Sequence, residues 1–380
     1  MSAARVDARD LAQMLNQRIE ALCRALLPGG VKDGFYWRCG SLGGEAGDSL
    51  GVHLGGRRQG MWVDFNGHTF GAKDGLAGDA LDLVARVKFG GNRGDAIRWA
   101  KDWLGIERAD PETLQEVRRE REQRSEEARD NAERRHQAAL RLFLEAQPQL
   151  AGTAAEIYLR DTRGIDFAVL GRQPRSLRFH PGITHRETCA RTPDGQIVWR
   201  TGRKCPCLVA AITGPDNKIH AVHLTFLERL ADGSVVKLRD VKDAKLTLGR
   251  YAGGAIRLWR GASKRPHSDP AAGEWVMTGE GIEDVATGVM AVPEMRAFVA
   301  VSLANMGSLW LPEAIEGVVI LAQNDPATNE RGEPHPARVA LARGIAHFKA
   351  IGKRVRLVRP PVFVKDINEY RQKLAQSELA

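Results

Sequence analysis

The sequence predicts a multi-domain α/β protein, built as an α+β chain that ends in a parallel sheet flanked by helices. Two observations predict this class. From residue 274 onward, short apolar runs alternate with segments of helical periodicity, which is the pattern of βαβ units. Residues 151–262 instead hold apolar runs separated by turn signals, which is typical of a β-rich segment. With 380 residues, the chain is long enough for two or three domains.

The first segment, residues 1–106, is predicted to be a helix followed by a small domain of strands and helices. The helix is amphipathic, with these residues on one face: Leu11, Met14, Leu15 and Ile19. Strand-like runs are expected at 34–39, 49–54 and 60–65, and helices at 78–89 and 92–105.

Residues 107–150 are predicted to form a charged helical linker. Glu and Arg recur there at helical spacing, and the segment has almost no apolar stripe before Ala138. Its arginines could alternatively grip nucleic acid, but the interleaved acids make a solvated helix the better interpretation.

Residues 151–265 are predicted to be a β-rich, basic subdomain. Its expected strands lie at 207–213, 218–227 and 234–241, with turn signals between them.

Residues 270–380 are predicted to form the parallel sheet and its helices. Strands are expected at 274–278, 297–302, 317–322 and 354–360, and helices at 282–292 and 335–352. The chain contains no G-x-x-x-x-G-K-[ST] motif, which argues against a P-loop motor.

Acidic residues follow three of the runs in this last segment. Glu280, Asp325 and Asp366 each come after an apolar strand, and Asp284 lies four residues after Glu280. Ligands of open parallel sheets gather at the carboxyl ends of the strands, and Mg²⁺ prefers carboxylate oxygens. Each acid taken singly could instead be a helix cap or a loop residue.

The order of three motifs carries a resemblance to a known family. The stretches "GEGIEDVATG", "VVILAQNDPA" and "KDINEY" resemble the Toprim domain of bacterial-type DNA primases and of related phage and mobile-element proteins. Glu280 and Asp284 match its Glu-Gly-x-x-Asp turn, Asp325 matches the second acid of its Asp-x-Asp, and Asp366 matches its late Lys-Asp-x-Asp. Gln323 and Asn368 stand where the family usually has Asp.

The resemblance implies magnesium-dependent phosphodiester chemistry at this site. It implies catalytic roles for Glu280, Asp284, Asp325 and Asp366. Of these, Glu280, Asp325 and Asp366 would be ligands of Mg²⁺ or Mn²⁺.

The segment 151–265 resembles the middle region of such proteins, which supplies a basic cleft for template and nucleotide. By position we expect the nucleic-acid-binding residues to be Lys237, Lys242, Lys245 and Arg250. They could instead be lysines and arginines that guard strand edges against aggregation.

The segment 1–106 is similar in outline to a primase zinc-binding domain without the zinc ligands. Cys39 stands alone, and His53 and His68 lie at no ligand spacing, so no zinc is expected. The domain would be held together by aromatic residues, which could alternatively stack on bases: Trp37, Trp62, Phe65, Trp99 and Trp103.

Composition fits this interpretation. The net charge of +9 is compatible with a polyanionic partner. The cysteines number five and show no disulfide framework; they are expected to be reduced thiols, although Cys205 and Cys207 could belong to a metal site. No apolar run is long enough for a membrane span and no secretory core is seen, so we expect a cytoplasmic protein with no membrane partner.

The predicted function is that of a DNA primase-like nucleotidyltransferase in the replication of a phage or mobile element. Its partners would be a single-stranded DNA template, nucleotides and a separate replicative helicase. Two alternatives remain open: a Toprim nuclease, and a catalytically weakened replication module that binds DNA or a partner.

Overall fold

The computed structural model describes residues 6–64, 77–106, 111–191, 197–328, 332 and 334–378. By internal contacts the chain divides into two compact units. The first comprises Met1–Asp130 with Thr188–Arg200, and the second comprises Asn131–Glu187 with Thr201–Ala380.

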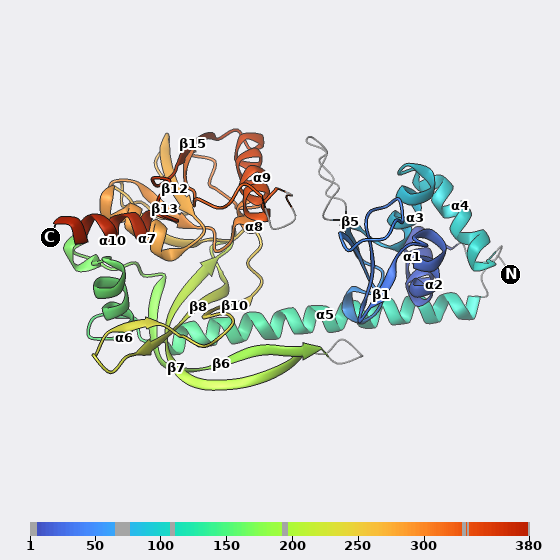
Figure 1. Ribbon diagram of the computed structural model, residues 1–380, viewed down its shortest axis with the longest axis horizontal. Helices are drawn as coiled ribbons and strands as arrows, with labels where there is room; N and C mark the ends of the chain where they lie inside the picture. Colours follow the sequence, from blue (N-terminus) through green and yellow to red (C-terminus); the bar gives the residue numbers. More distant parts are fainter. Residues whose placement is uncertain are drawn as a thin grey trace. The chain divides into compact units, whose positions relative to one another are not determined.

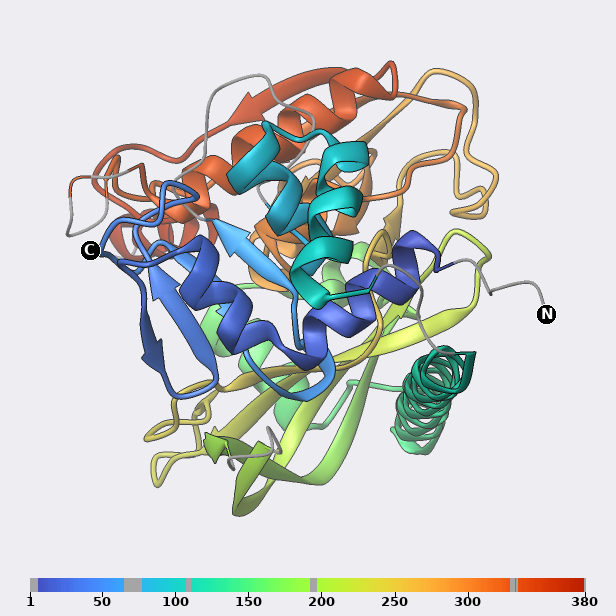
Figure 2. The same ribbon diagram turned by 90° about the vertical axis from the view of Figure 1, so that its right-hand side faces the viewer.

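The first unit is a five-stranded antiparallel sheet with helices on one face (Figures 1 and 2). The strands follow one another in chain order: β1 (Val31–Asp33), β2 (Tyr36–Cys39), β3 (Leu50–His53), β4 (Trp62–Asp64) and β5 (Ala77–Gly78). The helices are α1 (Ala8–Gln17), α2 (Ile19–Leu26), α3 (Ala80–Phe89) and α4 (Arg93–Leu104). A short 3₁₀ turn, η1, spans Gly56–Arg58.

Tryptophans contribute to the mainly aliphatic core between this sheet and its helices. Trp37 and Trp62 are buried, and their indole nitrogens donate to the carbonyl oxygens of Leu27 (3.1 Å) and Asp79 (3.0 Å). Trp99 and Trp103 stack on each other and pack against the same core. The expected packing role therefore holds for these four tryptophans, whereas Phe65 and His68 lie outside the described residues.

The lone Cys39 also lies in that core. Its thiol is buried and donates to the carbonyl oxygen of Ser41 over 3.3 Å. Burial raises the pKa of this thiol to about 11, so the sulfur stays protonated at neutral pH.

Helix α5 (Pro111–Glu145) covers most of the predicted charged linker. Its early part is less solvated than the sequence suggests, because Val117 is buried and Arg118 and Arg121 pair with the fully buried Asp10 of α1 at 2.9 and 3.1 Å. Near its end, Ala139 and Phe143 are buried against the β-rich sheet of the second unit. Between these ends the described side chains are mostly exposed, as expected.

The second unit contains most of an antiparallel sheet in the order β10-β8-β7-β6, with β9 also paired to β8. These strands are β6 (Leu177–Arg191), β7 (Ile197–Thr213), β8 (Ile219–Arg229), β9 (Val235–Lys237) and β10 (Lys245–Gly249). Short helical turns precede them: α6 (Ala154–Ile157), η2 (Tyr158–Thr162) and η3 (Phe167–Leu170).

The C-terminal sheet has the order β11-β13-β12-β14-β15 (Figure 1). Its strands are β11 (Ile256–Arg260), β12 (Glu274–Gly279), β13 (Arg296–Val299), β14 (Ile315–Leu321) and β15 (Arg354–Val358). All neighbours are parallel except β11, which pairs antiparallel with β13. The parallel sheet predicted from the sequence is confirmed, while β11 joins it from the segment assigned to the β-rich region.

Helices cover both faces of the C-terminal sheet: α7 (Ile282–Ala291), α8 (Leu303–Met306), α9 (Pro336–Ala350) and α10 (Ile367–Glu378). Alternate residues of each strand face opposite cores, since successive side chains of a strand point to opposite sides. Met277 and Val319 share one core with α7, whereas Val276 and Val318 share the other with α8 and α9. Within the described ranges, no helix is both long and apolar enough to cross a membrane.

Candidate functional site

The predicted acids lie at the carboxyl edge of the C-terminal sheet. Glu280 follows β12 directly, and Asp325 comes four residues after the end of the adjacent parallel strand β14. Asp284 lies in the first turn of α7, and Asp366 immediately precedes α10. The parallel pairing of β12 and β14 brings their ends to the same edge, as the sequence predicts.

Mutual repulsion shows which of these carboxylates are close. Burial, and then the Asp325 and Asp284 carboxylates, raise the pKa of Glu280 above its usual value. Burial and the nearby Asp366 raise the pKa of Asp284 to about 6. Within the site the charge of Glu280 is therefore coupled to those of Asp325 and Asp284, and the charge of Asp284 is coupled to that of Asp366.

Gln323, which stands where the family usually has Asp, points into this group and presents its amide nitrogen to Asp284. Its Nε2 donates to Oδ2 of Asp284 over 3.0 Å. The other carboxylate oxygen of Asp284 accepts from the backbone N–H of Asn368 at 3.3 Å. The amide nitrogen of Gln323 thus supplies a donor that the buried Asp284 carboxylate needs.

Asn368 has a structural task that an aspartate could not perform. Its side chain is 3% exposed, and its Nδ2 donates to the carbonyl oxygen of Arg163 at 2.8 Å and to Oγ1 of Thr287 at 2.9 Å. A carboxylate here would face the Arg163 carbonyl oxygen without a proton to share.

Asp366 serves partly as a helix cap. Its Oδ1 accepts from the backbone N–H of Glu369 over 2.8 Å, which is the bond of an N-terminal cap on α10. The alternative reading of this acid as a cap is therefore correct for one oxygen, while its charge still acts on Asp284.

A second acid of the α7 turn, Glu283, was not singled out in the sequence. It is 8% exposed and has three partners on its two oxygens. Tyr158 donates its hydroxyl to Oε1 at 2.8 Å, Lys237 lies 2.7 Å from Oε1, and Lys245 lies 3.1 Å from Oε2. Burial alone would raise the pKa of Glu283, but the two lysines hold it well below its usual range.

The predicted nucleic-acid-binding residues divide into two kinds. Lys237 on β9 and Lys245 on β10 converge on Glu283, and burial lowers the pKa of Lys237 to about 8. Lys242 and Arg250, before and after β10, are exposed. The structure thus brings the first two into the site and leaves the other two at the surface.

The carboxylate oxygens of this site are the ligands that a hard cation such as Mg²⁺ prefers, although they do not form a complete metal-binding site by themselves. Among the residues that the structure describes, no three Asp, Glu, His or Cys side chains group closely enough to hold a metal ion. Mg²⁺ usually keeps several waters and takes one or two carboxylates, so a pair such as Glu280 and Asp325 suits it. The repulsion that raises the Glu280 pKa is what a bound cation would relieve.

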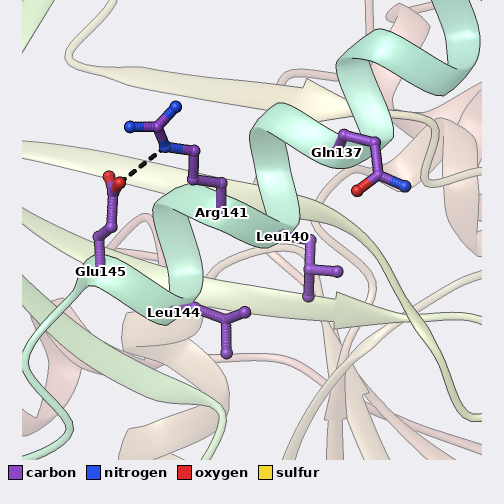
Figure 3. A pocket seen from close by; sticks show the side chains of 5 residues that line it. All are labelled: Gln137, Leu140, Arg141, Leu144 and Glu145. Carbon is purple, nitrogen blue, oxygen red and sulfur yellow. Dashed lines mark hydrogen bonds and ion pairs between the residues drawn. The ribbon is translucent and has the colours of Figure 1, made fainter.

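A hollow elsewhere in this unit has none of this chemistry. It lies along α5 and is lined by five residues of that helix, with Arg141 and Glu145 paired at 2.7 Å (Figure 3). Those residues are Gln137, Leu140, Arg141, Leu144 and Glu145.

The signal for Glu283 was present but ambiguous. It stands next to Asp284 in "GIEDVATG", and either acid could face inward in the first turn of a helix. Its partner Tyr158 lies 125 positions upstream, which no local pattern connects to it.

Comparison with known families gives two matches. Residues 275–376 match the family described as the Toprim domain, and residues 133–258 match a domain of unknown function, DUF7146. No curated protein matches the chain.

Among solved structures, distant likenesses occur to bacterial primases. The zinc-binding and RNA polymerase domains of the Aquifex aeolicus primase are 15% identical with a TM-score of 0.35, covering 100% of this chain and 84% of that one. A DNA primase domain from Pseudomonas aeruginosa is 15% identical with a TM-score of 0.38, covering 64% and 78%. The E. coli primase catalytic core is 14% identical with a TM-score of 0.38, covering 64% and 78%.

Proposed function

Residues 275–376 of this chain are a Toprim domain, and from this we propose that the protein is a DNA primase-like nucleotidyltransferase acting on single-stranded DNA. The observation that supports the proposal most is that the charges of Asp325 and Asp284 act on Glu280 at the carboxyl edge of the sheet, and that the charge of Asp366 acts on Asp284. The family match names the domain, and the acids supply the chemistry.

In this proposal Glu280, Asp325 and Asp366 would hold Mg²⁺ or Mn²⁺, which when bound neutralises phosphate charge and lowers the pKa of an attacking hydroxyl. Glu280 is half-buried, and its raised pKa suits it to accept a proton at that place. Asp284 would act through its negative charge on Glu280, and Gln323 and Asn368 hold it in position.

The basic residues would bind the polyanionic substrates. Lys242 and Arg250 are exposed and free to approach a phosphate backbone. Lys237 and Lys245 lie beside the acids, and we propose that they face nucleotide phosphates while Glu283 fixes their positions. The proposed setting, a phage or mobile element with a separate replicative helicase in the cytoplasm, is supported by the sequence resemblance alone.

One observation favours a second candidate, a catalytically weakened module that binds DNA or a replication partner. The amide of Gln323 occupies the place of a family acid and neutralises none of the cation's charge. A Toprim nuclease would use the same acids, and the assay below separates the three.

The test is primer synthesis on single-stranded DNA with ribonucleotides and Mg²⁺ or Mn²⁺, comparing the natural protein with Glu280→Gln. We expect the substitution to lower synthesis by at least about a hundredfold, because the amide keeps the shape but cannot accept a proton. The matched control is Glu294→Gln, an exposed residue of the same domain, which should leave synthesis unchanged.

Other outcomes separate the alternatives. Cleavage of labelled DNA without nucleotides would indicate the nuclease. DNA binding with neither synthesis nor cleavage would indicate the binding module. Normal synthesis by Glu280→Gln would contradict the assignment of this site.

A further inference from the structure

The loop after β15 exposes an apolar tip beside the candidate site. β15 is an edge strand of the C-terminal sheet (Figure 1), and residues 360–365 connect it toward α10. In this loop Val362 is 94% exposed and Phe363 is 67% exposed. Large apolar side chains held in water are unfavourable unless something covers them.

The exposure is enforced by the fold. Asn324, which follows β14, donates its Nδ2 to the carbonyl oxygens of Pro360, Pro361 and Val364 at 3.2, 2.8 and 2.9 Å. Its backbone N–H also donates to the carbonyl oxygen of Lys365 at 2.8 Å. One asparagine therefore fixes both ends of the loop, and the tip is held outward in a defined place.

The same bonds tie the tip to the candidate site. Asn324 directly precedes Asp325, and Lys365 directly precedes Asp366. The ring of Phe363 meets Tyr370 of α10 edge to face, with centroids 6.4 Å apart. The exposed ring of Phe363, packed on the half-buried Tyr370, thus stands next to the acids that would handle phosphodiester bonds.

The charges around the tip decide which partner fits it. Arg359 and Lys365 flank it in the chain and are exposed, and Arg359 donates to the carbonyl oxygen of Gln323 at 3.2 Å. Aromatic faces among cations are the recurring design for single-stranded nucleic acid, in which bases stack on rings and phosphates meet the cations. The preceding strand adds Leu357 and Val358, which are 40% and 42% exposed but lie between the exposed Arg356 and Arg359. A protein partner would call for a broader apolar surface than these side chains make among cations.

We propose that Phe363, supported by Tyr370, is a stacking platform for a base of single-stranded DNA at the entrance to the Toprim site. This inference rests on the proposed function in that it takes single-stranded DNA as the ligand. It adds a residue contact that depends on the bases rather than on the phosphates.

That distinction gives the test. Binding of a labelled oligothymidylate and of an abasic oligonucleotide of equal length is measured by fluorescence anisotropy over a range of salt concentrations. Phe363→Ala should weaken binding of the oligothymidylate about tenfold, leave binding of the abasic strand unchanged, and keep the salt slope, because no phosphate contact is lost.

Three variants serve as controls. Val362→Ala removes the other exposed apolar side chain and should have little effect on either ligand. Phe363→Trp should retain or strengthen base-dependent binding. Lys365→Ala should weaken both ligands and flatten the salt slope by about 0.7, as expected for one phosphate contact on a single strand.

The outcomes distinguish this inference from the proposed function. If the natural protein binds both oligonucleotides and Phe363→Ala binds them equally well, or loses both equally, the platform is wrong while DNA binding stands. If the natural protein binds neither, the proposed function fails and the platform fails with it. Circular dichroism of each variant verifies that the fold is retained.

Discussion

Glu283 and Asp284 are adjacent residues of one helical turn, and their pKa values are shifted in opposite directions. Both are more than nine-tenths buried, with 8% and 5% exposure. The pKa of Glu283 is held well below its usual range, whereas that of Asp284 is raised to about 6. Burial opposes the charge of both, so the difference must come from their neighbours.

The neighbours differ in charge. Glu283 meets two ammonium groups, from Lys237 and Lys245, and the Tyr158 hydroxyl. Asp284 meets only neutral donors, from Gln323 and Asn368, and a further carboxylate from Asp366. The negative charge of Glu283 is therefore compensated by lysines, which suits a structural role. The site around Asp284 keeps an excess of negative charge, which suits a cation.

The largest expected effect comes from breaking the compensated side. Glu283→Ala would leave two partly buried lysines without their counter-charge, and we expect it to lower the free energy of unfolding by about 3 kcal/mol. Urea denaturation at pH 7 measures this. Exposed Glu294→Ala should stay within about 0.5 kcal/mol of the natural protein.

The pH dependence of the same measurement identifies the cause. A depressed pKa gives stability that is present above the unfolded value of 4.5 and is lost as the pH falls through the folded pKa. The difference between the natural protein and Glu283→Ala should therefore shrink only below about pH 4.5. An equal difference at all pH values would mean that packing, and not the charge pair, was lost.

For Asp284 we expect the opposite dependence of stability on pH. Because the folded pKa of Asp284 is about 6 against 3.8 unfolded, the folded state holds the proton more tightly between these values. This group therefore lowers stability as the pH rises through that window. Asp284 is not one of the proposed ligands, but its negative charge attracts a cation held beside it, so apparent Mg²⁺ or Mn²⁺ affinity should fall below pH 6, by less than the roughly tenfold per pH unit expected of a ligand that must lose its proton.

Calorimetric titration between pH 5 and 8 measures this effect. In Asp284→Asn the dependence should flatten, since the titrating group is gone. Affinity that is independent of pH in the natural protein would show that Asp284 does not sense the cation.

The acids around Asp284 could be predicted well from the sequence, whereas the ion pairs of Glu283 could not. Glu280 and Asp325 could be placed together because they follow apolar runs of a parallel sheet, whose ends must meet at one edge. The same pattern indicated Asp366, and its spacing from Glu280 indicated Asp284; the Toprim resemblance then implied catalytic roles for all four acids, and the family match over residues 275–376 confirms that resemblance. Local pattern and topology were sufficient there.

Long-range pairs were beyond such reasoning. Lys237 and Lys245 are predicted from the sequence to bind nucleic acid or to guard a strand edge, because nothing near them in the chain shows that Glu283, 38 positions beyond Lys245, would meet them. Asn368 was read as a lost acid, yet its amide joins α10 to Arg163, 205 positions upstream. In both cases a buried polar group had to find a partner, and only the folded chain reveals which one.

The smallest expected effect comes from changing Gln323, whose amide keeps a further negative charge away from Asp284. Gln323→Asp adds a negative charge near Asp284 and removes the hydrogen bond that Asp284 accepts from the amide. Without metal, the added repulsion should raise the pKa of Asp284 further. With metal, attraction for the cation grows, although desolvation and acid–acid repulsion cancel most of the gain. We expect Mg²⁺ or Mn²⁺ to bind more tightly by about tenfold at most, which is roughly 1.4 kcal/mol.

Calorimetry on the natural protein, Gln323→Asp and Gln323→Asn measures this change in metal affinity. Gln323→Asn is the control, because the asparagine shortens the side chain equally without adding charge. Equal metal affinity in the two variants would show that charge at this position does not matter, and the weakened binding module would then become the better account of the chain.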